Sequence, residues 1–457
     1  MIMQLLEIKN FGPIKDVTIS ITDLMVFIGP QASGKSTIAK NIHYFRSIKD
    51  FLLESIEVVL NANGSKAGVS VEELWKLFQS NLRMKFAGFW GAGMHYKGFQ
   101  SSFHFSQYHK VEVMLEDGRI VHKFSDSLKI QIDKIFTEVC DFINGRRDLV
   151  SEPGMEYEGN KGQVVKYHLW NKITVEIKAA FKSPQSGSFI PANRSLITTL
   201  PDYLINLILR TTLEKQDSGD HLFDPYMIDL PTKQFINLIS FIKPQFTKSI
   251  DEIITEKESL IPEGIDKPSL QPFIEMIPQI LKGRYLYASG SERLYLPESN
   301  DFVNINLASS GQQESIWILL HLFRLALNKT PSLVVIEEPE THLYTETQVE
   351  LVNLLAHFCN INLNQLVVTT HSPYVLAAFN NLIFAHEVGR KQEEKISGII
   401  PKRYWLDPDK VSAYFVEDGK VEDILEPDLN QIAVERIDNA SRIVNQQYDQ
   451  MLELLDG

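Results

Sequence analysis

Residues 29–36 read Gly29-Pro30-Gln31-Ala32-Ser33-Gly34-Lys35-Ser36 and match the pattern G-x-x-x-x-G-K-[ST]. The apolar run at 24–28 is short and contains branched residues, which indicates a buried strand. A helical pattern begins at Lys35. A strand, a glycine-bounded loop and a helix in this order form the context in which the pattern holds phosphate. The segment therefore predicts a phosphate-binding loop.

The glycines explain how this loop would hold a nucleotide. Gly29 and Gly34 allow the backbone to curl until its N–H groups point inward, and the start of the following helix adds partial positive charge. Lys35 would then bridge the β- and γ-phosphates, and the Ser36 hydroxyl would bind Mg²⁺. The residues predicted to contact the nucleotide in this loop are Gly29, Pro30, Gln31, Ala32, Ser33, Gly34, Lys35, Ser36 and Thr37.

A second apolar strand, at 333–336, is followed by two acidic residues, Glu337 and Glu338. Carboxylates at the end of a buried strand are costly unless they meet a cation or water. We predict that Glu337 holds Mg²⁺ through its water shell and that Glu338 polarises the attacking water as general base. The alternative is a strand whose end simply reaches solvent, and a phosphate loop elsewhere in the chain disfavours it.

His371 follows a third apolar strand, at 366–370. A histidine at the polar end of such a strand can reach the γ-phosphate of a bound nucleotide, so we predict a catalytic role for His371. The alternative is a polar strand end with no role in chemistry.

The segment 307–313 precedes an apolar helical run at 316–327. Its serine and its backbone N–H groups would form an anion site at the start of that helix. Because one loop cannot surround a phosphate from both sides, Ser309, Gly311 and Gln312 are predicted to contact nucleotide bound to another copy of the chain. This arrangement implies a dimer, and an ordinary helix cap is the alternative.

The composition excludes several classes of protein. The chain has 457 residues, 44% of them hydrophobic, which suits two or three folding units. Cys140 and Cys359, its two cysteines, form neither a disulfide framework nor a paired zinc motif. The absence of a bilayer-length apolar run and of a signal sequence predicts a cytoplasmic protein with no membrane partner. The net charge of −13 argues against nucleic-acid binding by bulk electrostatics but leaves a local basic groove open.

The chain divides into three predicted segments. Residues 1–201 and 282–457 are expected to form two parts of one α/β domain. Residues 202–281 are expected to form a compact helical insertion, which prolines cut into short pieces and which lacks the uninterrupted heptads of a long coiled coil. Between about 84 and 200 the composition indicates an antiparallel sheet, with a hairpin turn at Asp117-Gly118.

In their order along the chain, the segments 29–36, 308–312 and 333–338 and then His371 resemble the Walker A, signature, Walker B and switch-histidine motifs of ABC-type ATPases. The resemblance implies an α/β fold with a phosphate-loop mixed sheet, flanking helices and an antiparallel subdomain. It also implies ATP and Mg²⁺ as cofactors.

More narrowly, the segments 8–11, 337–343 and 369–373 look like the RecF/SMC-like branch of these ATPases, which is often found in bacterial and phage-defence operons. Two features depart from the branch. Glu337 stands where many relatives have aspartate, and the segment 308–312 is a relaxed form of the signature. Neither departure removes a required oxygen or hydroxyl.

The resemblance implies an ATP-dependent switch in which two copies sandwich two Mg·ATP and hydrolysis opens them. The ATPase subunits of PARIS-type and Septu-type anti-phage defence systems are similar in kind. The expected partners are therefore a second copy, as a homodimer or within a higher homo-oligomer, and a separate effector protein, a nuclease. The alternatives are a RecF-like DNA repair ATPase and an ABC transporter cassette, and nucleic-acid binding stays open.

Other polar residues have a structural interpretation beside a functional one. Four histidines that could suggest a metal site lack ligand spacing and are interpreted as ordinary sheet residues: His95, His104, His109 and His122. The acidic segment 417–423 is interpreted as a hairpin turn with solvated charges.

Two assignments are left open by the sequence. The glutamine that often positions the attacking water in such ATPases has three candidates, Gln100, Gln107 and Gln185, and none is assigned. Residues 190–194 resemble a return strand of the RecF/SMC-like branch, in which Arg194 would lie near phosphate or, as we prefer, in a structural salt bridge.

Overall fold

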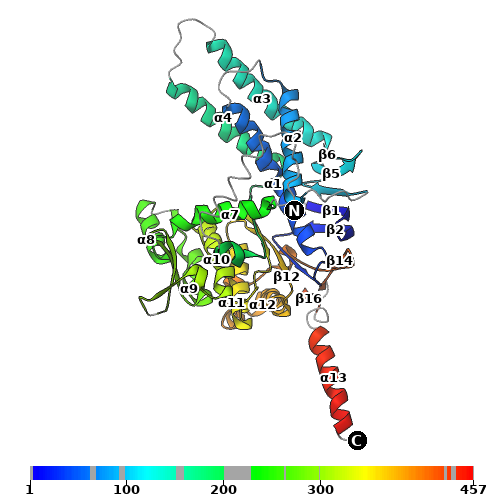
Figure 1. Cartoon of the computed structure of the whole chain (residues 1–457), viewed down its shortest axis with the longest axis vertical. Helices are drawn as coiled ribbons and strands as arrows, with labels where there is room; N and C mark the ends of the chain where they lie inside the picture. Colours follow the sequence, from blue (N-terminus) through cyan, green and yellow to red (C-terminus); the bar gives the residue numbers. More distant parts are fainter. Residues whose placement is uncertain are drawn as a thin grey trace. The chain divides into compact units, whose positions relative to one another are not determined.

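The computed structural model describes residues 4–61, 68–91, 98–150, 159–199, 228–261, 264–297, 299–426, 430–433 and 439–455. The chain forms two compact units, drawn in Figure 1. The first unit comprises residues 1–21, 40–187 and 215–230, and the second comprises residues 22–39, 188–214 and 231–457. These units cross the predicted boundaries at 201 and 281, and the helical pattern at 203–209 lies outside the described residues.

An antiparallel sheet of five strands, in the order β2-β1-β4-β5-β6, organises the first unit. Its strands are β1 (Gln4–Phe11), β2 (Ile14–Ile21), β4 (Gln100–His104), β5 (Lys110–Glu116) and β6 (Arg119–Phe124). Apolar residues alternate along β1, so that Leu6 and Ile8 are buried on one face. The predicted hairpin is confirmed, because β5 and β6 pair across Asp117 and Gly118, which both have positive φ.

The described residues of the first unit also form helices. They are α1 (Lys35–Asn61), whose first turn belongs to the second unit, α2 (Val71–Trp90), α3 (Asp126–Val150) and α4 (Gly159–Ala180). Figure 1 shows α3 and α4 side by side, and they pack against each other. The prediction of sheet between about 84 and 200 is therefore wrong for the end of α2 and for α3 and α4, whereas β4, β5 and β6 agree with it. In α3 the buried residues Leu128, Ile132 and Ile135 follow a helical period, which outweighs β-branched composition.

The second unit is built on a six-stranded mixed sheet in the order β14-β13-β3-β12-β11-β7. Its strands are β3 (Leu24–Ile28), β7 (Ser186–Ile190), β11 (Ser332–Glu337), β12 (Gln365–Thr370), β13 (Val411–Glu417) and β14 (Lys420–Asp423). Strands β13, β3, β12 and β11 run parallel, and β14 is antiparallel to β13. The strands β3 and β11 are buried along their whole length, as continuous apolar runs in parallel sheets usually are.

The described residues of the second unit also form helices and small sheets. The helices are α5 (Arg194–Thr199), α7 (Leu230–Ile242), α8 (Ile250–Leu260), α9 (Lys267–Leu281), α10 (Ser310–Leu327), α11 (Thr345–Asn360), α12 (Pro373–Ser397) and α13 (Asn439–Leu455). The strands β8 (Arg284–Ala288), β9 (Ser291–Tyr295) and β10 (Phe302–Asn304) form one sheet, and β15 (Leu425–Glu426) pairs with β16 (Gln431–Ile432).

Helix α9 differs from the predicted short pieces. It continues through Pro272 and Pro278 and packs on α10 and α11, so it is part of the second unit. Each internal proline removes one backbone hydrogen bond. The apolar face of α9, which includes Phe273 and Ile277, is buried and offsets that loss.

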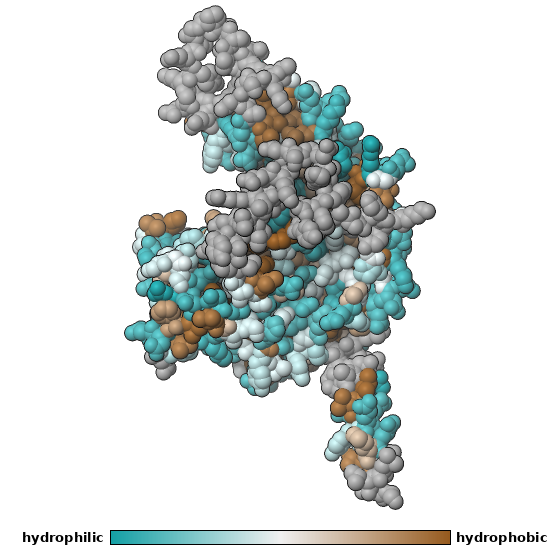
Figure 2. All heavy atoms as spheres, viewed as in Figure 1, coloured by the Kyte–Doolittle hydropathy of each residue, from teal (hydrophilic) through white to brown (hydrophobic). Residues whose placement is uncertain are grey.

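The predicted fold class is confirmed: the second unit is α/β with a mixed sheet, and the described residues contain no long coiled coil. Among those residues, no helix has both the length and the apolar character needed to cross a membrane. Figure 2 shows apolar side chains on the surface of α13, where Val444, Tyr448 and Met451 are exposed.

Candidate nucleotide site

The predicted phosphate loop (residues 29–36) joins β3 to α1, and three of its residues have positive φ. Gly29 and Gly34 have φ values of 152° and 112°, and Ala32 between them is left-handed at 58°. A Cβ atom added at Gly29 would lie 2.1 Å from the carbonyl oxygen of Val416 in β13. Gly29 is therefore required both by its backbone angle and by the neighbouring strand.

Lys35 lies inside this loop. Its Nζ donates to the carbonyl oxygens of Gly29 and Pro30, at 2.9 and 2.8 Å, and the side chain is buried. Burial lowers the pKa of Lys35, and the carboxylates of Glu338 and Glu340 oppose this shift. Phosphate oxygens are stronger acceptors for an ammonium group than these neutral carbonyl oxygens.

The donors present fit a bound triphosphate. Besides Lys35, the loop contains Ser33, whose Oγ is buried and has no hydrogen-bond partner within the described part of the chain. The helix that begins at Lys35 adds its N-terminal N–H groups. Ser36 is the second residue of that helix, where its hydroxyl could bind Mg²⁺.

The register of the parallel strands brings the predicted residues to one edge of the sheet. Thr370 pairs with Ile28, the residue before the phosphate loop, and Thr369 pairs with Glu337. The carboxyl ends of β3, β12 and β11 therefore lie side by side, which is the edge where α/β sheets bind ligands.

Glu337 and Glu338 have different surroundings at this edge. Glu337 ends β11, is only 7% exposed, and accepts a hydrogen bond from the Ala192 N–H at its Oε2. Glu338 has a left-handed backbone with φ of 45°, and its N–H donates to the Thr369 carbonyl at 2.8 Å. This turn brings the Glu338 side chain out of the strand, where it is 36% exposed.

His371 follows β12 and lies beside Glu338, with its Nε2 3.5 Å from Glu338 Oε1. Burial and, next, the charge of Lys35 lower the pKa of His371, whereas Glu338 and Glu340 act in the opposite direction. The imidazole is therefore neutral at pH 7. Lys35, Glu338 and His371 thus form one electrostatic cluster.

Glu340 is a residue of this cluster to which the sequence analysis assigned no role. It is 8% exposed, and its Oε1 accepts hydrogen bonds from the Thr370 hydroxyl at 2.6 Å and from the His371 N–H at 3.0 Å. Burial raises the pKa of its carboxyl group. Glu340 thereby joins the turn after β11 to the end of β12. Its sequence signal was a third carboxylate two positions beyond Glu338.

The signature segment (residues 308–312) forms the start of α10. Ser309 is the N-cap: its Oγ accepts from the Gln312 N–H, and Gln312 Oε1 accepts from the Ser309 N–H. Gln312 Nε2 donates to the Leu281 carbonyl at 2.8 Å. The helix-cap alternative thus describes this chain, and contacts of Ser309, Gly311 and Gln312 with a partner's nucleotide stay predictions.

Gly311 is explained within the chain. A Cβ atom at this position would lie 2.7 Å from the carbonyl oxygen of His342. The absence of a side chain therefore lets the start of α10 approach the turn after Glu338 closely.

A family model described as an AAA ATPase domain matches residues 1–376. The chain belongs to this family. The match covers the phosphate loop, the signature segment, the end of β11 and His371. No curated protein matches the chain.

Among solved structures, the chain is similar to three SMC heads. The SmcHead bound to the C-winged helix domain of ScpA is 14% identical, covers 93% of this chain and 97% of its own, and has a TM-score of 0.40. The SMC head domain from Thermotoga maritima is 12% identical, covers 93% and 98%, and has a TM-score of 0.35. The Smc head domain with an extended coiled coil, bound to the C-terminal domain of ScpA derived from Pyrococcus furiosus, is 15% identical, covers 98% and 99%, and has a TM-score of 0.37. The family assignment rests on the family match alone.

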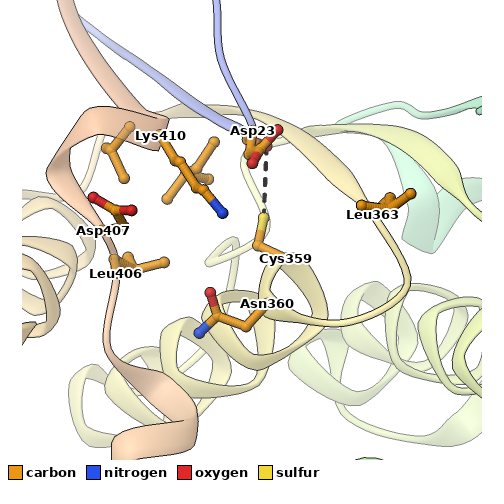
Figure 3. A pocket seen from close by; sticks show the side chains of 9 residues that line it. Asp23, Cys359, Asn360, Leu363, Leu406, Asp407 and Lys410 are labelled. Atoms are coloured by element: carbon orange, nitrogen blue, oxygen red, sulfur yellow. Dashed lines mark hydrogen bonds between the residues drawn. The ribbon is translucent and has the colours of Figure 1, made fainter. Parts of the chain in front are cut away.

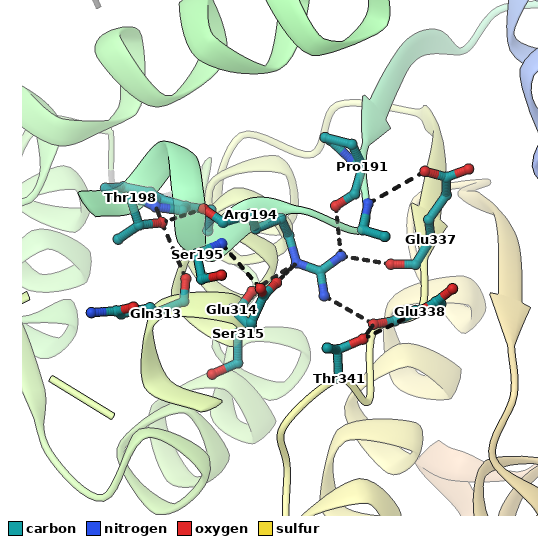
Figure 4. Close-up of polar contacts among 12 residues, drawn as sticks. Pro191, Arg194, Ser195, Thr198, Gln313, Glu314, Ser315, Glu337, Glu338 and Thr341 are labelled. Atoms are coloured by element: carbon teal, nitrogen blue, oxygen red, sulfur yellow. Dashed lines mark hydrogen bonds and ion pairs between the residues drawn. The ribbon is translucent and has the colours of Figure 1, made fainter. Parts of the chain in front are cut away.

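Arg194 of this AAA ATPase domain is fully buried beside the end of β11 (Figure 4). Its Nε lies 3.1 Å from Glu314 Oε2, which agrees with the structural salt bridge preferred from the sequence. Burial lowers the pKa of Arg194, and Glu314 is the first of four carboxylates that oppose this shift. A guanidinium nevertheless keeps its charge in proteins, so the pair is ionic.

Three of the four histidines considered as metal ligands contact neighbouring residues of the chain. His109 hydrogen-bonds the Ala180 carbonyl, and His122 lies 2.6 Å from the Tyr44 hydroxyl. His104 contacts Glu7, and His95 lies outside the described residues. Within the described ranges, no group of three or more candidate ligands could hold a metal ion.

Residues 417–423 include the turn between β13 and β14, as predicted. Gln100, Gln107 and Gln185 all belong to the first unit and remain unassigned.

A separate pocket lies where β3 and β13 begin, the sheet edge opposite to the phosphate loop (Figure 3). It is lined by Asp23, Leu24, Cys359, Asn360, Leu363, Leu406, Asp407, Lys410 and Val411. The Cys359 thiol faces the Asp23 carbonyl oxygen, and burial raises its pKa. This pocket lies at the opposite ends of these strands and is therefore distinct in position from the candidate nucleotide site.

Proposed function

We propose that the protein is an ATP-binding and ATP-hydrolysing molecular switch of the ABC type, in the RecF/SMC-like branch. The observation that carries this proposal is the cluster at one sheet edge. A buried ammonium, Lys35, lies within the phosphate loop, and a carboxylate and a neutral imidazole, Glu338 and His371, face each other 3.5 Å apart beside it. These are the groups that binding and hydrolysing a nucleoside triphosphate require.

Each residue has a defined part in this proposal. Lys35 and the loop N–H groups hold the β- and γ-phosphates, and Ser36 and Glu337 hold Mg²⁺. The metal ion, when bound, neutralises phosphate charge. Glu338 takes the proton of the attacking water, because it is the acid of the pair at the end of β11 that reaches solvent. His371 donates a hydrogen bond to the γ-phosphate.

The proposal includes closure of two copies over two nucleotides. The surface around the signature segment supports it: Ser309 is exposed, and the large apolar residues Leu307 and Tyr344 are 74% and 71% exposed. Closure of a second copy over this segment would remove both apolar side chains from water. Ser309 and Gly311 of one copy would contact the γ-phosphate held by Lys35 of the other.

The test is phosphate release from ATP and Mg²⁺ by the purified chain, with Lys35→Ala as the inactive variant. The variant should bind ATP about tenfold or more weakly and lose hydrolysis, because its buried cation is gone. Lys40→Ala is the matched control, since Lys40 lies on the same helix but pairs with Asp229. Equal hydrolysis by wild type and Lys35→Ala would refute the assignment.

The output of the switch is proposed from the sequence resemblance alone. By that resemblance the chain is the sensor or regulatory ATPase of a bacterial anti-phage defence system, and it controls a separate nuclease effector. Co-purification of the chain with the product of the neighbouring gene, with and without ATP, tests this part. A permease or a replication protein as the stable partner would contradict the defence role.

A further inference from the structure

Arg194 has an unusual set of partners. It follows the turn after β7 and begins α5, with its whole side chain buried. Its guanidinium donates to four carbonyl oxygens, those of Glu314 (2.9 Å, from Nε), Pro191 (2.7 Å, from Nη1), Glu337 (2.6 Å, from Nη1) and Glu338 (2.9 Å, from Nη2). Figure 4 shows the guanidinium between these groups.

Two of the four carbonyls belong to the pair of acids at the end of β11. Arg194 therefore holds the backbone of Glu337 and Glu338 at the point where the chain enters the left-handed conformation of Glu338. A non-glycine residue in that conformation is costly and persists only when its surroundings hold it. The Thr341 hydroxyl also donates to the Glu338 carbonyl, at 2.9 Å.

The other side of the guanidinium contacts the helix that carries the signature segment. Glu314 lies in the second turn of α10. Its Oε1 accepts a hydrogen bond from the Ser195 N–H, and its Oε2 forms an ion pair with Arg194 Nε at 3.1 Å. A shift of the start of α10 would therefore displace Arg194 and, through Arg194, the backbone of Glu338.

We infer that Arg194 is a positioning residue that aligns the Glu338 carboxylate for attack on the nucleotide and couples this alignment to the start of α10. The inference rests on the proposed hydrolysis. Closure of a second copy on the signature segment would then act on the general base of the same chain through a rigid, fully buried link.

Arg194→Lys tests this role, because lysine keeps the charge but concentrates its three donors on one atom and cannot span carbonyls on two sides. The variant should bind ATP with a dissociation constant within about twofold of wild type, since Lys35 is untouched. Its kcat should fall by at least about tenfold, as expected for a misplaced catalytic group.

The Glu338→Gln background separates positioning from general damage. If Arg194 acts through Glu338, Arg194→Lys should not lower the residual single-turnover rate of Glu338→Gln any further. A multiplicative loss in that background, or a wild-type kcat in Arg194→Lys alone, would overturn the inference. If wild type itself does not hydrolyse ATP, the proposed function fails instead.

A paired substitution guards against misfolding. Removing only Arg194 leaves Glu314 as a buried, unpaired charge, whereas Arg194→Met together with Glu314→Gln removes both charges. This double variant should stay folded, as judged by circular dichroism, and bind ATP with a low kcat. A folded double variant with a wild-type kcat would show that the link to Glu338 is not needed.

Discussion

His371 Nε2 lies 3.5 Å from Glu338 Oε1, although the two residues follow different strands. The two side chains are 34% and 36% exposed, so both can meet a ligand. Parallel pairing of β11 and β12 brings them together, and Glu340 holds the His371 N–H in place. A neutral imidazole beside a solvent-accessible carboxylate is suited to a general base that must stay ionised.

Replacing the general base should separate binding from hydrolysis. Glu338→Gln should keep ATP affinity and lower kcat by about 10²–10⁴-fold, since an amide cannot accept the proton of water. Glu337→Gln should instead lower the affinity for Mg²⁺, so that ATP binding needs a higher Mg²⁺ concentration. Nucleotide affinity and phosphate release at varied Mg²⁺ check both, and the opposite pattern would mean that the two glutamates exchange roles.

The low pKa of His371 predicts how hydrolysis depends on pH. The imidazole is neutral above its pKa, and burial together with Lys35 keeps that value below the usual 6.5. Hydrolysis should therefore be unaffected by His371 protonation near pH 8 and should fall as the pH drops through the lowered pKa. Profiles of kcat against pH for wild type and His371→Gln test this. If kcat of His371→Gln falls at low pH as it does in wild type, the fall is caused by another group.

Mixed dimers should report on the signature segment. Ser309→Arg should block closure sterically and leave ATP binding intact, whereas Ser309→Asn keeps the helix cap without bulk and serves as the control. In a dimer of Ser309→Arg with Lys35→Ala, one composite site carries both lesions and the other carries none. Partial ATPase activity should then return. Mixtures with confirmed subunit exchange that stay as inactive as their parents would exclude the shared site.

A buried histidine away from the candidate site should make the second unit sensitive to acid. His321 is 2% exposed, its Nε2 lies 2.9 Å from Ser188 Oγ, and burial lowers its pKa to about 3. The unfolded chain takes up this proton near pH 6.5 and the folded chain does not, so stability falls as the pH drops below 6.5. His321→Gln keeps a hydrogen-bonding group and removes this pH-dependent loss of stability.

The free energy of unfolding at pH 7 and pH 5, measured by denaturant titration, checks this prediction. Wild type should lose about 2 kcal/mol more than His321→Gln between the two values. Equal losses would mean that His321 is protonated in the folded protein.

The sequence by itself determined the nucleotide loop and the three strand ends. A short apolar run with branched residues favours a buried strand of a parallel sheet, and the polar residues after such strands then fall at one edge. Lys35, Glu338 and His371 could be predicted in this way, because each follows or interrupts a strong local pattern. The hairpin at Asp117-Gly118 could also be predicted, because the residues that favour its turn are adjacent in the sequence.

Only the tertiary structure decided the roles of Glu340, Gly311 and Arg194. Their partners are distant in the chain: Thr370 for Glu340, the His342 carbonyl for Gly311, and the carbonyls of Glu314, Glu337 and Glu338 for Arg194. Backbone carbonyls carry no side-chain signal, so no sequence pattern marks the residues that bind them. Packing also decided that α9 continues through two prolines, because the burial of its apolar face outweighs a local rule about helix breaking.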